Sequence, residues 1–304
     1  MITTSGTLSP LSSFSSSLGF VSPIMLKNEH VVGSDRVLVR TMKQGVNGCV
    51  LNGTHANCNN HSYLFDMGLT MLKLMGVIPG GVIVFFPSTA SMSIAMRFWE
   101  TALDADNTGL TIWQSMHYEK VVVVEPPSTE GMAMVMNKFK DGVQSRGSVL
   151  FAVCRGKFSE GMDFPDDLCR AVFNVGVPYL PRRDTKVQLM MEYQNTRARE
   201  MCVSSSTAKD HGDKWYKRQA HLAVNQGCGR ALCHASDHGV VIFFDVRYSN
   251  TGASGGLSEW LVSETSFFPH CFCFQILIRP AKIKHPDSDT IIVGAGVDAI
   301  FRSI

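Results

Sequence analysis

The sequence is poor in charged residues and has no long apolar run. Only 18% of its 304 residues are charged and 45% are hydrophobic, so most of the chain can bury a large core. Apolar runs such as 82–86 and 240–244 are far shorter than the roughly 20 residues of a membrane helix. No basic segment precedes an apolar stretch at the N-terminus. The sequence therefore predicts a protein that is neither secreted nor partnered with a membrane.

Charge of one sign and paired cysteines are also missing. The 28 basic and 26 acidic residues leave a net charge of +2, so any attraction for phosphate must be local. The nine cysteines include no CxxC pair, which argues against a disulfide framework and a structural zinc site. The segment His270-Cys-Phe-Cys273 resembles part of a metal site, but it has no second pair at usable spacing. We expect no metal site and a reducing compartment.

Between the two ends of the chain, helical and extended patterns alternate. Apolar residues recur at helical spacing from Leu64 to Ile78, and a continuous β-branched and aromatic run follows. Unbroken apolar strands separated by helices are typical of an α/β fold, in which a mainly parallel sheet is covered on both faces. Ligands bind such sheets at the carboxyl ends of the strands. We expect strands at 82–86, 121–124, 149–153, 171–175 and 240–245, and helices at 63–78, after Ser88, near 130–143, near 185–200 and at about 214–233.

The segment after the strand at 149–153, residues 154–164, combines glycine with polar and basic side chains. We call it the glycine loop. Gly156 and Gly161 let backbone amides approach a ligand, and Arg155 and Lys157 add positive charge, so the loop could hold phosphate oxygens. Ser159 adds a hydroxyl and Asp163 could accept from a ribose hydroxyl or hold the loop. An ordinary turn between strand and helix is the alternative. No GxxxxGK[ST] sequence occurs, so the chain contains no Walker A loop.

The last predicted helix carries a second polar group. Gln226 and Arg230 are four residues apart and so share a helical face, and we expect Gly229 between them to permit close approach of another backbone. A Gln and Arg pair suits a nucleotide base or a phosphate. A surface helix with a solvated arginine explains the same residues equally well.

Positive charge is concentrated between residues 182 and 218. Nine Lys or Arg residues and five acids lie there, whereas the rest of the chain is slightly acidic. We expect the two helices of this segment to flank the ligand cleft, which permits contact with a phosphate backbone. A solvated charged face is the more frequent cause of such a run.

Four segments, in order, resemble motifs of the XPD-like superfamily 2 DNA helicases. Thr4-Ser-Gly-Thr-Leu-Ser-Pro10 resembles motif III, and Val84-Phe-Phe-Pro-Ser88 resembles motif IV. The glycine loop is similar to motif V, and Gln226-Gly-Cys-Gly-Arg230 is similar to motif VI. Within this family the residues resemble the branch of the Fanconi anaemia group J helicase most, and that of the regulator of telomere elongation helicase next.

The resemblance implies the second RecA-like lobe of a two-lobed motor, with ATP bound between the lobes. Residues 1–19 would be a remnant of the first lobe, 20–265 the second lobe and 266–304 a divergent tail. The resemblance assigns Arg230 and Gln226 to catalysis at the γ-phosphate, and Gly161, Asp163, Gly229, Gly6 and Thr7 to the nucleotide. It assigns Ser88, Arg155, Lys157, Ser159 and Glu160 to the DNA backbone.

The sequence departs from the family in two ways. Motif VI of the family continues to a second arginine, and Cys233 stands at that position. In the family, the phosphate loop, the Mg²⁺ acid and the iron–sulfur cluster belong to segments upstream of motif III, and the sequence does not include these segments. We therefore expect a helicase lobe that binds single-stranded or forked DNA, shares ATP and Mg²⁺ with a first lobe, meets DNA repair proteins and works in the nucleus. The chain alone would be inactive, as a fragment or truncated product. A non-catalytic module that binds nucleic acid or a partner is the alternative.

Overall fold

The computed structural model describes residues 24, 26, 32, 36–105, 109–200, 205–249, 256–263 and 265–266. Gly6, Thr7 and the expected remnant 1–19 lie outside the described residues, as do residues 267–304 of the expected tail. Within the described residues, no helix is long and apolar enough to cross a membrane.

The described strands form one parallel sheet of seven strands, which confirms the predicted fold class. The five predicted strands are present, whereas β1 and β7 were not predicted. β1 ends in Arg40 and Thr41, and β7 has only two residues, so neither is an unbroken apolar run. In order across the sheet the strands are β3 (Val121–Val124), β4 (Ser148–Val153), β2 (Gly81–Phe86), β5 (Ala171–Val175), β6 (Gly239–Phe244), β1 (Val37–Thr41) and β7 (Thr265–Ser266).

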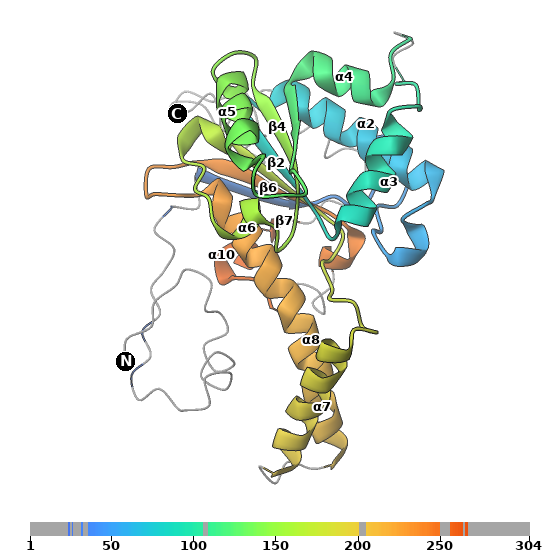
Figure 1. Ribbon diagram of the computed structural model, residues 1–304, viewed down its shortest axis with the longest axis vertical. Coiled ribbons are helices and arrows are strands. Elements are labelled where there is room, and N and C mark those ends of the chain that lie inside the picture. Colours follow the sequence, from blue (N-terminus) through green and yellow to red (C-terminus); the bar gives the residue numbers. More distant parts are fainter. Residues whose placement is uncertain are drawn as a thin grey trace, which may run out of the picture.

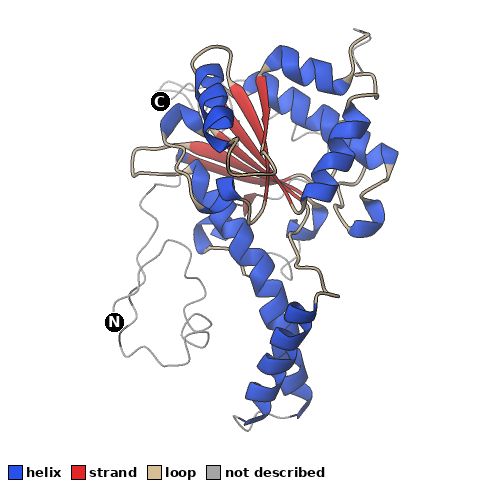
Figure 2. Ribbon diagram, in the orientation of Figure 1, coloured by secondary structure: helices blue, strands red, loops and turns tan. Residues whose placement is uncertain are grey.

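Helices cover both faces of the sheet (Figures 1 and 2). One face carries α2 (His61–Val77), α3 (Thr89–Trp99) and α4 (Ile112–Glu119). The other carries α5 (Met132–Val143), the single turn α6 (Lys157–Glu160), α8 (Ser205–Cys228) and α10 (Glu259–Ser263). The predicted helix at 214–233 is wrong at both ends: α8 begins nine residues earlier and ends at Cys228. The eight-residue α4 was not predicted.

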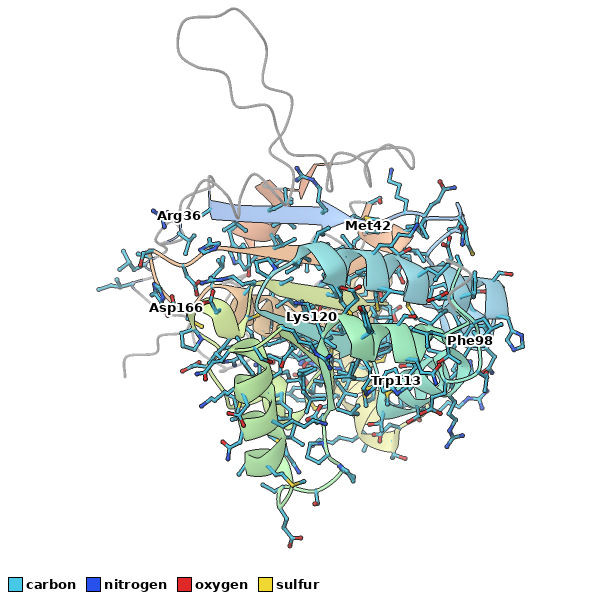
Figure 3. All side chains as sticks on the ribbon, turned by 90° about the horizontal axis from the view of Figure 1, so that it is seen from above. Arg36, Met42, Phe98, Trp113, Lys120 and Asp166 are labelled. Atoms are coloured by element: carbon cyan, nitrogen blue, oxygen red, sulfur yellow. The ribbon has the colours of Figure 1, made fainter. Side chains whose placement is uncertain are left out.

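Alternate residues of each central strand enter opposite halves of the core. In β2, Val84 and Phe86 pack toward α2 and α3, whereas Ile83 and Phe85 pack toward α5 and α8. All six residues of β2 are buried, as expected for a strand covered on both faces. Figure 3 shows the side chains filling both layers, with Arg36 and Met42 at opposite ends of β1.

The helices α7 (Thr185–Glu200) and α8 pack against each other, and this hairpin projects from the body of the molecule (Figure 1). The described basic residues of 182–218 lie on this hairpin and at its base, and the expectation that the two helices flank a ligand cleft stays a prediction. Arg182 pairs with Asp213 at 2.7 Å, and both side chains are largely exposed.

Candidate functional site

The carboxyl ends of the parallel strands bring several predicted residues to one edge of the sheet. Ser88 follows β2 and begins α3, where its hydroxyl oxygen accepts a hydrogen bond from the backbone N–H of Ser91 at 3.2 Å. Ser88 is exposed. A capping serine at a helix N-terminus leaves neighbouring N–H groups directed outward. The loop after β2 is therefore open to a ligand at this edge.

The glycine loop follows β4 at the same edge, and Glu125 lies beneath it. Glu125 comes directly after β3, and its two carboxylate oxygens accept from the backbone N–H groups of Val153 and Lys157, each at 2.8 Å. A Cβ atom on Gly156 would lie 2.6 Å from Oε1 of Glu125, so the approach requires glycine. These two amides hold a carboxylate of the protein itself. They are therefore not offered to phosphate oxygens, and the expectation that other groups of the loop bind phosphate stays a prediction.

Arg155 holds the other side of the glycine loop. Its backbone φ is +60°, which is uncommon for a residue other than glycine. Its Nη1 atom donates to the carbonyl of Pro178 and its Nη2 atom to the carbonyl of Gln219, each at 2.8 Å. Pro178 follows β5 and Gln219 belongs to α8. The side chain that was predicted to contact DNA therefore joins three elements of the lobe.

The remaining predicted residues of the loop divide into inward and outward ones. Ser159 is buried, and its hydroxyl donates to the carbonyl of Gly156 at 2.9 Å, so it does not offer that proton outward as expected. Lys157 and Gly161 are exposed. Glu160 ends α6, and its side chain lies outside the described part of the chain.

Arg230 connects the end of α8 to the far end of the glycine loop. Its guanidinium donates to the carbonyl of Ser159 through Nε at 3.2 Å and Nη2 at 3.0 Å, and through Nη1 to the carbonyl of Met162 at 2.7 Å. The same Nη1 lies 3.1 Å from Oδ1 of Asp163. The side chain of Asp163 is 85% exposed, whereas that of Arg230 is 19% exposed. The two predicted groups thus meet, and Asp163 is the outward partner.

The environment of Gln226 and Gly229 differs from the expected helical face. The α-helix ends at Cys228 and Arg230 lies in the 3₁₀ turn Gly229–Ala231, so the four-residue spacing does not span a regular helix. Gln226 is half-buried. No atom of another element would lie within 4 Å of a Cβ on Gly229, so the expected close approach there is wrong. The close approach is at Gly227, where a Cβ would lie 3.1 Å from the ring of Phe85.

Beyond Arg230, a network of ion pairs joins the segments that lead into β5 and β6. The backbone N–H of Cys233 donates to Oδ2 of the buried Asp237 at 2.9 Å, and Arg170 donates to its Oδ1 at 2.9 Å. Nε2 of His234 lies 3.0 Å from Oδ1 of Asp166. The ligand atoms of Asp166, His234 and Asp237 lie within 4.8 Å of one another. Arg170 already neutralises Asp237, so the ion pairs account for this group. Burial raises the pKa of the Cys233 thiol.

Two acidic residues at this edge of the sheet, Glu125 and Asp245, were not predicted as site residues. Asp245 is buried after β6, and its Oδ2 atom accepts from the N–H of Gly53 at 2.8 Å and from Arg247 at 2.6 Å. Each of these acids directly follows an apolar strand, and that position is the signal that could have found them. At this edge, the half-buried Glu125 holds the glycine loop, and the buried Asp245 holds the segment at Gly53.

Comparison with known proteins shows what this edge belongs to. The family model described as "Helicase C-terminal domain" matches residues 71–264, which include both the glycine loop and Arg230. The chain belongs to the helicase C-terminal domain family. A solved structure titled "XPD_Helicase" shares the fold, with a TM-score of 0.55 at 18% identity over 83% of this chain and 40% of that one.

The curated relatives are longer proteins of the same kind. The chain is 34% identical over 266 residues to a regulator of telomere elongation helicase 1 homolog from Arabidopsis thaliana, and 35% identical over 265 residues to one from Aedes aegypti. Each match covers 86% of this chain and 25% of the relative. The chain thus spans about a quarter of their length, and it corresponds to a helicase lobe.

Proposed function

We propose that the chain acts as the second RecA-like lobe of an ATP-dependent DNA helicase. The observation that supports this best is the bonding of Arg230 to the glycine loop at Ser159, Met162 and Asp163. This bonding makes the end of α8 and the loop after β4 one continuous surface. A shift of Arg230 toward a nucleotide would therefore move the loop that faces DNA.

On the nucleotide side, Arg230 supplies the charge. A guanidinium placed against a transferring phosphoryl group stabilises the negative charge that develops on it. In this chain the guanidinium is held by neutral carbonyls and by one exposed carboxylate, so a phosphate could replace Asp163 at small cost. Gln226, Gly161 and Gly229 lie on the same part of the lobe in this proposal. ATP with Mg²⁺ would supply the phosphoryl group, and the Mg²⁺ ligands would belong to a first lobe.

On the DNA side, the outward groups are Ser88 with the N-terminus of α3, and Lys157. Both follow strands at the same edge of the sheet, and both are exposed. Backbone N–H groups and a lysine suit phosphates and carry no sequence preference. We propose single-stranded DNA, including the strand of a fork, as the ligand. DNA repair proteins and a nuclear site of action accompany this proposal.

The test uses the chain itself. Binding of a fluorescein-labelled oligothymidylate is measured by anisotropy at several salt concentrations, and ATPase is measured with and without the DNA. We expect DNA binding that weakens with salt and no ATP hydrolysis. DNA-stimulated hydrolysis that Arg230→Ala abolishes would contradict the assignment of a single lobe, and the absence of DNA binding would contradict the DNA contacts.

Cys233 favours a second candidate, a module that binds nucleic acid or a partner without catalysis. A second arginine that stabilises transferring charge contributes about 10³-fold or more in phosphoryl-transfer enzymes. A cysteine with a raised pKa offers no such charge. Joining this lobe to the first lobe of a relative and comparing ATPase with and without Cys233→Arg separates the two. A low ATPase rate that rises strongly with Cys233→Arg favours the module. A substantial ATPase rate that the substitution leaves unchanged favours the motor.

A further inference from the structure

Glu125 and Arg155 hold the glycine loop from opposite sides. Glu125 reaches the loop from the end of β3 and fixes two amides, at Val153 and Lys157. Arg155 reaches from the loop to the carbonyls of Pro178 and Gln219, which belong to other elements. Neither side chain is placed outward toward a ligand. Both instead determine where the exposed Lys157 stands.

The contacts of Glu125 are those of a fixed support. A carboxylate that accepts two backbone N–H groups forms charge-assisted hydrogen bonds, which are about twice as strong as neutral ones. The two amides lie on either side of Gly156, whose missing side chain leaves room for the carboxylate. The loop therefore enters α6 in one conformation, with Arg155 in the left-handed region.

The contacts of Arg155 tie this conformation to α8. Gln219 lies on α8 and Arg230 lies eleven residues later, in the turn after this helix. Arg155 thus joins the start of the glycine loop to α8 near Gln219, and Arg230 joins its end to the turn after α8. The loop is therefore attached at its start to α8 and at its end to the turn that carries Arg230.

We propose that Glu125 and Arg155 are positioning residues that hold the glycine loop in the conformation that presents Lys157 to DNA. This proposal rests on the proposed function, because it names how the same site binds DNA. It reassigns Arg155, which motif resemblance placed on the DNA backbone, to a contact within the lobe.

Whether DNA affinity falls or rises when Glu125 is replaced shows whether Glu125 positions the loop. Glu125→Gln removes a negative charge, so electrostatics alone would leave oligothymidylate affinity unchanged or increase it. If Glu125 positions the loop, affinity falls by about tenfold instead, because one amide then faces the donor group of glutamine. Glu130→Gln is the matched control, since Glu130 is an exposed acid on the following loop. We expect it to bind at least as well as the unaltered chain.

Salt dependence tests Arg155. A residue that contacts a phosphate of single-stranded DNA contributes about 0.7 to the slope of log affinity against log salt. A direct contact predicts that Arg155→Gln loses this amount and that Arg155→Lys restores it. The positioning role predicts that both variants bind more weakly, because lysine cannot reach two carbonyls at once. Restoration by lysine would overturn the proposal for Arg155.

Hydrogen–deuterium exchange makes the result independent of DNA binding. We expect peptides covering 154–163 to exchange faster in Glu125→Gln and Arg155→Lys, and those of α2 and α3 to be unchanged. Unchanged exchange in 154–163 would overturn the proposal even if the chain bound no DNA. Faster exchange without DNA binding by the unaltered chain would keep the support for the loop and reject the DNA-binding function.

Discussion

The loop after β2 and the glycine loop leave the same edge of the sheet, but their polar side chains are used in different ways. The Ser88 side chain forms local hydrogen bonds, with Ser91 in the first turn of α3. In the glycine loop, Arg155 and Ser159 bond inward, and Glu125 supports the loop from another strand. A residue at a motif position can thus contact the ligand itself, or it can hold in place another residue that contacts the ligand.

The largest expected effect breaks the support of the glycine loop. Gly156→Ala places a Cβ against both carboxylate oxygens of Glu125 and the carbonyl of Val153. We expect the free energy of unfolding to fall by roughly 2–3 kcal/mol, because the backbone must move to relieve the overlap. Urea denaturation measures it. Gly229→Ala is the control, since nothing of another element lies within 4 Å of its Cβ. Equal losses in the two variants would contradict the comparison.

A lysine at the opposite, amino end of the sheet gives the next effect. Lys120 is buried and donates to the carbonyl of Gly80 at 3.0 Å, and burial lowers its pKa to about 8. Between pH 8 and about 10.4 the unfolded chain binds a proton that the folded chain does not, so this group adds stability as pH rises. We expect the stability difference between the unaltered chain and Lys120→Met to shift by roughly 1–3 kcal/mol toward the unaltered chain.

Parallel urea titrations of both proteins at pH 7.5 and 10 measure this shift. Subtracting the variant cancels the cysteines and tyrosines that titrate in the same range. A difference that does not change with pH would show that Lys120 is not held in its neutral form. DNA affinity should stay the same, because the residue lies away from the carboxyl edge.

The smallest expected effects come from two residues of the glycine loop, the inward-facing Ser159 and the outward-facing Lys157. Ser159→Ala removes a buried hydrogen bond, so we expect a loss of about 1–2 kcal/mol in stability and no change in salt slope. Lys157→Gln should keep its stability and lose about 0.7 from the salt slope of oligothymidylate binding. Urea titration and anisotropy on the same two samples decide it. If Ser159→Ala alone changed the slope, the inward assignment would be wrong.

The sequence predicts the sheet well and the use of its loops less well. Unbroken apolar runs such as 82–86 are strands buried on both faces of the sheet, and this burial is the reason that every position in them is apolar. The bonds of Arg155 and Glu125 join residues 23 to 64 positions apart, and no local pattern encodes them. For the same reason Gly227 rather than Gly229 meets a neighbour, because Phe85 comes from a distant strand. Motif spacing finds the edge, and tertiary packing decides which of its residues face outward.

Hydrogen–deuterium exchange of the chain with and without oligothymidylate tests the central claim most directly, because it locates the bound strand. We predict protection at 86–91 and 154–163, where Ser88 and Lys157 face outward, and little change along the projecting part of α7 and α8. Protection confined to that hairpin, with exchange at the two loops unchanged, would contradict the account.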